Sequence, residues 1–226
     1  MMTFNPVIYE IQRVSGRHVE AMRKYSSATI CEAYGGRGAL SHTIKPIKPG
    51  MKLCGPVVPV MTRPGDNLIV HKAIYAAQPQ DILLVCTLNF VEAGFWGGVM
   101  TEAAMQRGIA GLVTDGSVRD SEEIIRMSFP VFSQSLCIKG TTKSCLGTVN
   151  HPMIFNEIQI LPGDLILGDD DGLVVVARND VPEVIEMTQK RVEKEQRIIS
   201  ALREGKTTLE LFDFTNTLER IGLKEK

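Results

Sequence analysis

The sequence predicts an α/β fold in which a central parallel sheet is followed by antiparallel strands and a long C-terminal helix. The centre alternates apolar runs with helical segments, namely ILLVCTL (82–88), WGGVMTEAAMQRG (96–108), IAGLVTD (109–115) and SEEIIRM (121–127). This order of strand, helix, strand and helix is typical of parallel crossovers. The unbroken apolar runs indicate strands that are buried on both faces.

The N-terminal part precedes this centre. The first forty residues favour helix, with Ser26 and Ser27 as candidate caps before ATICEAYGG. The segment KLCGPVVPVMT is rich in β-branched residues and carries two prolines, which favours an edge or bent strand. DNLIVHKAIYAAQ repeats its apolar residues at helical spacing from a cap at Asp66.

The C-terminal part begins near Val131, where short β-rich segments are separated by Gly, Pro and Asn turns. This spacing predicts antiparallel strands. GDDDGLVVV (168–176) could suggest a calcium loop, but its acids do not alternate, so we interpret it as a hairpin turn. Asp180 and Pro182 then begin a long charged helix that ends at Gly205.

Composition excludes several classes of function. The chain has 226 residues and 44% hydrophobic content, enough for one sizeable core. Lys and Arg number 25 against 26 Asp and Glu, and aromatic residues make up 6%, so neither nucleic acid nor an anionic membrane is an expected partner. The five cysteines are scattered and odd in number, and no apolar run is long enough to span a bilayer. We therefore expect a cytoplasmic protein with reduced thiols.

The stretch VTDGSVRDSEE (113–123) concentrates charge immediately after a predicted core strand. Ligands bind in crevices at the carboxyl edge of such sheets, and Gly116 would let the backbone approach one closely. Arg119 offers a planar fork for a carboxylate, and Asp120 is a hard oxygen ligand for Mg²⁺. The competing interpretation is local: the acids shape a turn and favour the helix N-terminus. An arginine near a positive helix end is harder to explain in that way.

Two further segments could line the same site. EAGFWGGVM places Gly97 and Gly98 at a helix start, where several N–H groups could face an oxyanion, although close packing would also explain the glycines. Asn67 lies in the first turn of the preceding helix and could direct its amide at a ligand. His71 and Lys72 are interpreted as ordinary helix residues.

The stretch WGGVMTEAAMQRGIAGLVTDGSVRD resembles the family that joins 4-hydroxy-4-methyl-2-oxoglutarate/4-carboxy-4-hydroxy-2-oxoadipate aldolases with RraA-like proteins. The resemblance extends to PGDNLIVHKAIYAA, PVFSQSLCIKGT, PGDLILGDDDGLVVV and TTLEL, and it covers most of the chain from Ser27 to Leu211. It implies an α/β/β/α sandwich of the swivelling-domain type in one domain over 1–226. Residues 1–25 would be an N-terminal helical extension and 206–226 a C-terminal tail.

The resemblance also implies a metal-dependent pyruvate aldolase that decarboxylates oxaloacetate, assembled as a trimer or dimer of trimers with sites at subunit interfaces. Asp120 would hold Mg²⁺ or Mn²⁺, and Arg119 would bind the pyruvyl part of a 2-oxo acid substrate. Asn67 would line the pocket, and a glutamate near Glu193 or Glu195 would reach the metal from a neighbouring subunit. Backbone N–H groups would grip the substrate carboxylate, contributed by Gly97, Gly98, Val99 and Met100.

One position departs from the aldolase pattern. The aldolases usually carry Asp or Glu twenty-one positions before the arginine, acting through water as acid or base, and this chain has Gly98 there. Glu102, one helical turn further on, or Glu92, just before the glycines, could supply the missing carboxylate. We expect aldol cleavage to need this group more than decarboxylation does, because departing carbon dioxide takes no proton.

Two alternatives stay open at the level of sequence. RraA-like regulators bind and inhibit an RNA-degrading endonuclease and characteristically lack the complete Arg-Asp pair, whereas Arg119 and Asp120 are both present here. A different lyase or hydratase could use the same metal and arginine. The pair favours an enzyme.

Overall fold

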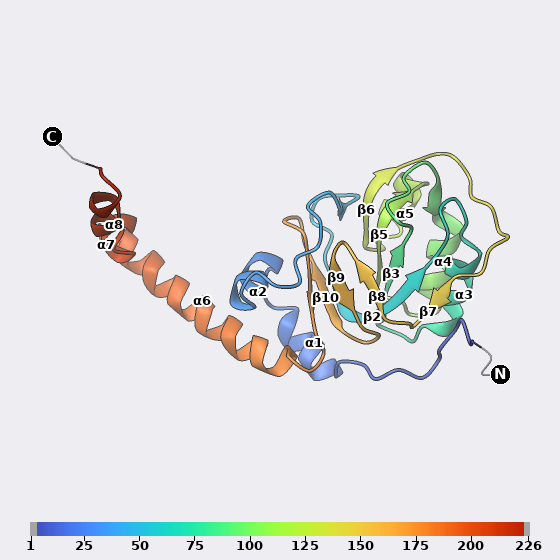
Figure 1. The fold of residues 1–226 in the computed structure, drawn as a ribbon, viewed down its shortest axis with the longest axis horizontal. Coiled ribbons are helices and arrows are strands. Elements are labelled where there is room, and N and C mark those ends of the chain that lie inside the picture. The colour runs from blue at the N-terminus through green and yellow to red at the C-terminus, as the bar shows by residue number, and fades with distance from the viewer. Residues whose placement is uncertain (1–3, 224–226) are drawn as a thin grey trace.

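The computed structural model describes residues 4–223 and has a mixed α/β fold with a curled mixed sheet and a long C-terminal helix (Figure 1). The predicted fold class is confirmed. The helices are α1 (Gly16–Met22), α2 (Ser27–Ala33), α3 (Leu68–Ala76), α4 (Gly98–Gln106), α5 (Ser121–Arg126), α6 (Val181–Arg203), α7 (Thr208–Leu211) and α8 (Phe214–Arg220). The strands are β1 (Lys45–Pro46), β2 (Leu53–Met61), β3 (Ile82–Cys86), β4 (Gly94–Trp96), β5 (Gly111–Val118), β6 (Val131–Leu136), β7 (Thr148–Val149), β8 (Met153–Phe155), β9 (Ile158–Ile160), β10 (Leu165–Gly168) and β11 (Leu173–Val176).

The main sheet changes from parallel to antiparallel pairing along its strand order, β1-β6-β5-β3-β2-β10-β11. Strands β2, β3, β5 and β6 run parallel, so their carboxyl ends meet at one edge. Strands β10 and β11 are antiparallel, and β10 joins this part to β2. The short β4 adds to β5, β7 adds to β2, and β8 and β9 form a separate hairpin.

Alternating side chains of these strands build three apolar cores, which explains the unbroken apolar runs. In β3, Leu83 and Val85 pack with α3 and α4, whereas Leu84 faces the opposite core. That inner core lies between the parallel strands and the strands β8 to β11. In β10, Leu165 and Leu167 face a third core shared with α1, α2 and the start of α6. The order helix, sheet, sheet, helix follows, as in the predicted α/β/β/α sandwich.

Two strand predictions were wrong in their details. β2 is an interior strand, not an edge. Along one side of β2, the partner strand changes from β10 to β7, and the two prolines lie at this change. Pro56 is the last residue paired with β10, and Pro59 directly precedes the pairing with β7, so neither proline interrupts a continuous ladder. β6 pairs antiparallel only with the short β1, and it is parallel to β5 because α5 provides the crossover between them.

The N-terminal extension is helical only in α1. Residues 8–15 run without helix along the body, and the first three residues lie outside the described range. This segment is held by backbone hydrogen bonds from Ile8 to Val149 and from Val14 to Gly163, which compete with helix formation. Of the two candidate caps, Ser26 is the cap of α2, since its hydroxyl accepts from Thr29 N, and Ser27 is the first helical residue.

The C-terminal helix α6 runs away from the sheets and carries α7 and α8 at its far end (Figure 1). Its buried residues, Val181, Val184 and Thr188, lie in its first half. The predicted tail therefore contains two short helices within residues 208–220, and residues 224–226 lie outside the described range. Among the described helices, none combines the length and apolar character required to cross a bilayer.

A buried ion pair anchors the N-terminal segment to the central sheet. Arg13 donates from Nε to Asp81 Oδ1 and from Nη2 to Asp81 Oδ2, both at 2.8 Å. The Asp81 side chain is fully buried and also accepts from Gln78 N. Removing the arginine would leave a buried carboxylate without its counter-charge.

We expect Arg13→Ala to lower the free energy of unfolding by about 3 kcal/mol, because breaking a buried pair from one side costs about that much. Urea denaturation followed by circular dichroism measures the change. The exposed Arg17→Ala, four residues along, is the matched control and should change stability by less than about 0.5 kcal/mol. A loss below about 1 kcal/mol in Arg13→Ala would show that the pair does not anchor the segment.

Candidate active site

The candidate site is a pocket of about 300 Å³ at the carboxyl edge of the parallel strands. Besides β4 itself, the segments that line it follow the ends of β2, β4, β5 and β6, which is where ligands bind in such sheets. The lining residues are Asn67, His71, Gly94, Phe95, Trp96, Gly97, Val99, Met100, Arg119, Asp120, Gly140, Thr141 and Lys143. The structure thus brings together most of the predicted substrate-binding residues.

Arg119 and Asp120 directly follow β5, which continues to Val118 instead of ending near Asp115. Asp120 is the N-cap of α5, yet its carboxylate makes no capping bond. Its backbone lies in the left-handed region (φ 56°), and its Oδ2 accepts from Gly98 N at 3.1 Å and lies 3.6 Å from Arg119 Nε. Residues held in this sparsely populated conformation are concentrated at functional sites. Capping of its own helix therefore does not explain the Asp120 carboxylate, which accepts from α4 instead.

Gly97 and Gly98 make room for the acidic side chains of the next segment. A Cβ on Gly97 would overlap Asp120 Oδ2 and come within 3.2 Å of Arg119 Cγ, and a Cβ on Gly98 would overlap the Glu123 carboxylate. Gly116, in contrast, does not face the pocket as expected. A Cβ there would lie 2.7 Å from Thr87 Oγ1 and 3.1 Å from Phe95 Cδ2, so this glycine serves core packing.

Asn67 contributes an unpartnered acceptor to the pocket lining. Its Nδ2 donates to Phe95 O at 2.9 Å, which orients the side chain, and the residue is 5% exposed. Within the described part of the chain, its Oδ1 is buried and has no hydrogen-bond partner. Buried acceptors are normally satisfied, so a ligand donor or an ordered water fits this position.

Asp66 holds the loop that closes the pocket, and its role extends beyond the predicted cap. Its Oδ1 accepts from Leu68 N at the start of α3. Its Oδ2 accepts from Thr142 Oγ1, from both N and Oγ of Ser144, and from Cys145 N. Burial by itself raises the pKa of this carboxyl, but the hydrogen bonds from Leu68, Ser144 and Thr142 outweigh it and lower the pKa to about 2.

His71 and Lys143 line the pocket, and the sequence analysis did not identify them as site residues. His71 lies one helical turn after Asn67 on α3, so its spacing was the available signal. Burial, followed by the charge of Lys143, lowers the pKa of His71 and favours a neutral imidazole. Lys143 lies on the loop held by Asp66, and no local pattern links that loop to α3. Lys72 is exposed and directs its ammonium toward the Tyr9 ring.

The other predicted carboxylates lie outside the pocket lining. Glu102 is exposed on α4, and its Oε1 accepts from Gln106 Nε2. Glu92 pairs with Lys139 at 2.5 Å, and both side chains are exposed. Glu195 pairs with Arg191 at 3.0 Å on α6, and Glu193 accepts from Gln189. Figure 1 places α6 on the far side of the molecule from α4 and α5, so one chain does not bring Glu195 to Asp120.

The chemistry of the donors fits a loosely held divalent cation. Across residues 4–223, no group of three His, Cys, Asp or Glu side chains gathers as in a complete protein metal site. Mg²⁺ commonly needs only one or two carboxylates, because waters and substrate oxygens complete its coordination. The half-exposed Asp120 carboxylate and the unpartnered Asn67 Oδ1 are oxygen donors of this kind.

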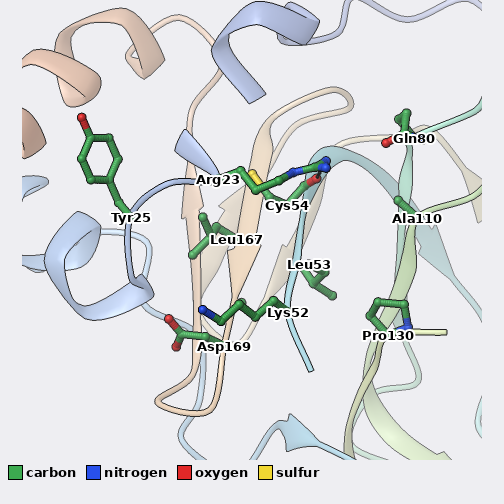
Figure 2. Close-up of a pocket in the computed structure, with 11 residues that line it drawn as sticks. Arg23, Tyr25, Lys52, Leu53, Cys54, Gln80, Ala110, Pro130, Leu167 and Asp169 are labelled. Atoms are coloured by element: carbon green, nitrogen blue, oxygen red, sulfur yellow. Dashed lines mark hydrogen bonds between the residues drawn. The ribbon is translucent and has the colours of Figure 1, made fainter. Parts of the chain in front are cut away.

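A second cavity, of about 250 Å³, lies at the opposite edge of the sheet, where the parallel strands begin (Figure 2). Two of its charged groups already have structural partners: Arg23 donates to Cys54 O, and Asp169 accepts from N and Oγ of Ser27. Figure 2 shows Lys52 and Asp169 on one wall, facing Ala110 and Pro130 across the cavity. None of the predicted site residues lines it, so the carboxyl-edge pocket is the better candidate.

Comparison with known proteins identifies the family of the chain. The RraA-like family model, described as Aldolase/RraA, matches residues 27–175. A protein of Halalkalibacterium halodurans, named as a candidate 4-hydroxy-4-methyl-2-oxoglutarate aldolase, is 32% identical over 76% of this chain and 82% of its own. A Thermus thermophilus protein named 4-hydroxy-4-methyl-2-oxoglutarate aldolase is 29% identical over 49% of this chain and 68% of its own. The solved structure of the RNA-processing inhibitor RraA from Thermus superposes with a TM-score of 0.62 at 25% identity, over 67% of this chain and 92% of that one.

We expect Asp66→Asn to lower the free energy of unfolding by about 3 kcal/mol at neutral pH, since several hydrogen bonds to a buried charged acceptor are lost. A folded pKa of about 2, below the unfolded value of about 3.9, means that the carboxylate stabilises the fold above about pH 4. That contribution is lost as the pH falls from about 4 to 2.

Urea denaturation of wild type and Asp66→Asn across this pH range measures the difference. The difference in the free energy of unfolding between the two proteins should decrease on acidification. The exposed Asp171→Asn should have the same free energy of unfolding as the wild type at every pH. A gap that is independent of pH would contradict the depressed pKa of Asp66.

Proposed function

Because the chain belongs to the RraA-like family, described as Aldolase/RraA, we propose that it is a divalent-metal-dependent lyase that acts on short 2-oxo acids. The reaction is retro-aldol cleavage of a 4-hydroxy-2-oxo di- or tricarboxylic acid to pyruvate, decarboxylation of oxaloacetate, or both. The single observation that supports it most is the pair Arg119 and Asp120 in the carboxyl-edge pocket, with Asp120 in a left-handed conformation and its carboxylate free of capping. Names of relatives as aldolases add to this support.

The charges of the pocket suit an anionic substrate. Arg119 and Lys143 provide two cations against the single carboxylate of Asp120 among the lining residues. Arg119 binds the pyruvyl carboxylate or its carbonyl through a planar fork, and Lys143 neutralises the distal carboxylate. The first-turn N–H groups of α4, at Val99 and Met100, have no acceptor within the helix and complete the carboxylate site together with Gly97. The Gly98 N–H, also predicted for this role, donates to Asp120 Oδ2 instead.

Both reactions need a place for the electron pair left when a carbon–carbon bond breaks. Mg²⁺ or Mn²⁺, when bound by Asp120, would polarise the 2-oxo group and stabilise the enolate. Arg119 holds the substrate so that its 2-oxo oxygen lies toward Asp120, which is a positioning effect. Asn67 presents its unpartnered Oδ1 to a water or hydroxyl of the bound ligand. Lys72 does not line the pocket, so no lysine other than Lys143 is available there for a Schiff base among the lining residues.

We also propose that the protein works as a homo-oligomer, a trimer or dimer of trimers, with sites at the interfaces. Exposed apolar side chains lie at the pocket mouth and on the loop after β6: Val99 is 84% exposed and Ile138 95% exposed. An interface between copies of the chain would remove these side chains from water. In such an assembly, Glu195 of a neighbouring copy would approach the Asp120 site. Light scattering coupled to size exclusion measures the mass directly.

The second candidate function is a non-catalytic regulator of an RNA-degrading enzyme. It is supported by the likeness to the RNA-processing inhibitor from Thermus. A different lyase or hydratase with the same metal and arginine is a third candidate. A regulator needs neither Asp120 nor a divalent cation, so metal-dependent turnover separates these functions.

We expect the purified protein with Mg²⁺ or Mn²⁺ to release pyruvate from oxaloacetate, and EDTA to abolish this release. Asp120→Ala should lose at least about 10²-fold in kcat/KM, because its oxygen ligand for the cation is removed. Mn²⁺ binding, followed by calorimetry or electron paramagnetic resonance without substrate, should weaken in the same variant.

The control is Asp213→Ala on the C-terminal tail, another aspartate with a left-handed backbone that lies outside the pocket. It should bind Mn²⁺ and release pyruvate as the wild type does. Turnover that survives EDTA, or unchanged Mn²⁺ binding in Asp120→Ala, would refute the metal site.

A further inference from the structure

Glu123 places its carboxylate where a side chain of residue 98 would otherwise lie. A Cβ on Gly98 would overlap Oε2 and the carboxyl carbon of Glu123, and Oε1 would lie 2.9 Å away. We propose that Glu123 is the general acid–base carboxylate of the site, a role that rests on the proposed lyase function. The vacancy at Gly98 is thereby filled from α5 instead of from α4.

The position beside the metal-binding carboxylate supports this role. Gly98 N donates to Asp120 Oδ2 at 3.1 Å, and the Glu123 carboxylate lies where a Cβ of Gly98 would be. Both acids therefore contact the same glycine. Asp120 is the N-cap of α5 and Glu123 lies in its first turn, and their carboxylates lie against the neighbouring glycines Gly97 and Gly98. Glu123 is not itself a lining residue, but its carboxylate lies over Gly98, directly beside the lining residue Gly97. It is exposed and retains access to solvent, as a proton-exchanging group requires.

The other carboxylates near the glycines are already engaged. The Glu92 carboxylate is tied to Lys139, whose hydrogen bond and charge lower the pKa of Glu92. Glu102 accepts from Gln106 on the outer face of α4. The described hydrogen bonds and ion pairs include none to the Glu123 carboxylate, although it lies against the Gly97–Gly98 backbone.

The proton transfers balance without any further reactant. In retro-aldol cleavage, the Glu123 carboxylate takes the proton of the 4-hydroxyl group, directly or through one water, as the C3–C4 bond breaks and C4 becomes a carbonyl. The electron pair of that bond forms the enolate of pyruvate. The protonated Glu123 then returns the proton to C3, which gives the methyl group of pyruvate and restores the carboxylate.

A purely structural role for Glu123 is the competing explanation. Glu122 and Glu123 both lie in the first turn of α5, where negative charge is favourable. Glu122 shares this electrostatic setting but does not lie over Gly98, so Glu122→Gln is the matched control. A role in helix stability would affect both variants alike.

The test uses pyruvate itself, so it does not depend on knowing the natural substrate. In D₂O with Mn²⁺ or Mg²⁺, the wild type should exchange the methyl protons of pyruvate for deuterium, as followed by proton NMR. Glu123→Gln should slow this exchange by about 10²-fold or more, the usual contribution of a general acid–base group. Glu122→Gln should exchange at the wild-type rate, and Mn²⁺ affinity should be the same in all three proteins.

A second test moves the carboxylate from residue 123 on α5 to residue 98 on α4, which share the same space. Glu123→Ala removes the side chain that a residue at position 98 would displace, so Gly98→Asp combined with Glu123→Ala rebuilds a carboxylate from the α4 side. This double variant should recover at least about tenfold of the exchange lost in Glu123→Ala. Cleavage of 4-hydroxy-4-methyl-2-oxoglutarate should follow the same order and fall further than decarboxylation of oxaloacetate.

Several results would overturn the role of Glu123. These are wild-type exchange in Glu123→Gln, equal losses in Glu122→Gln and Glu123→Gln, or no recovery in the double variant. Loss of exchange in His71→Gln but not in Glu123→Gln would assign the proton transfer to the imidazole. A wild type that neither exchanges pyruvate protons nor releases pyruvate from oxaloacetate would refute the lyase function itself. The two failures are distinguishable, because the role of Glu123 can be refuted separately only when the wild type is active.

Discussion

The buried carboxylate of Asp66 is the interaction on which the candidate site most depends. It joins the start of α3 to the loop 142–145, two segments that are far apart in the sequence. Because the charge is buried and receives five hydrogen bonds, neither segment can move without leaving donors and a charge unsatisfied. Asn67 on one side and Lys143 on the other are thereby held around one pocket.

The glycines of the site are as important to its shape as the residues that carry side chains. Gly97 and Gly98 bring the backbone of α4 against two acids at the start of α5, and Asp120 accepts a hydrogen bond from that backbone. The left-handed conformation of Asp120 turns its carboxylate away from its own helix and toward α4. The cost of that conformation is tolerated because the surrounding elements determine it, a pattern usually seen at functional positions.

Much of the fold was predictable because it follows from local patterns. The apolar runs of β3 and β5 alternate between two cores, which is why neither strand shows a polar face. The pairing of β2 was not predictable, because its prolines are acceptable only where β10 pairing ends and β7 pairing begins. Likewise, the α5 crossover makes β6 parallel, although its composition resembles that of the antiparallel strands that follow.

Residue types and short spacings along the chain were enough to predict the fold class, the Arg119–Asp120 pair and the glycines that accompany it. Only the tertiary structure showed that Lys143 and His71 share the pocket, that Gly116 packs against Thr87, and that Glu123 occupies the space above Gly98. These relations join residues that lie on different elements. They depend on how the strands pair and how the loops are anchored, and spacing along the chain does not encode such distances.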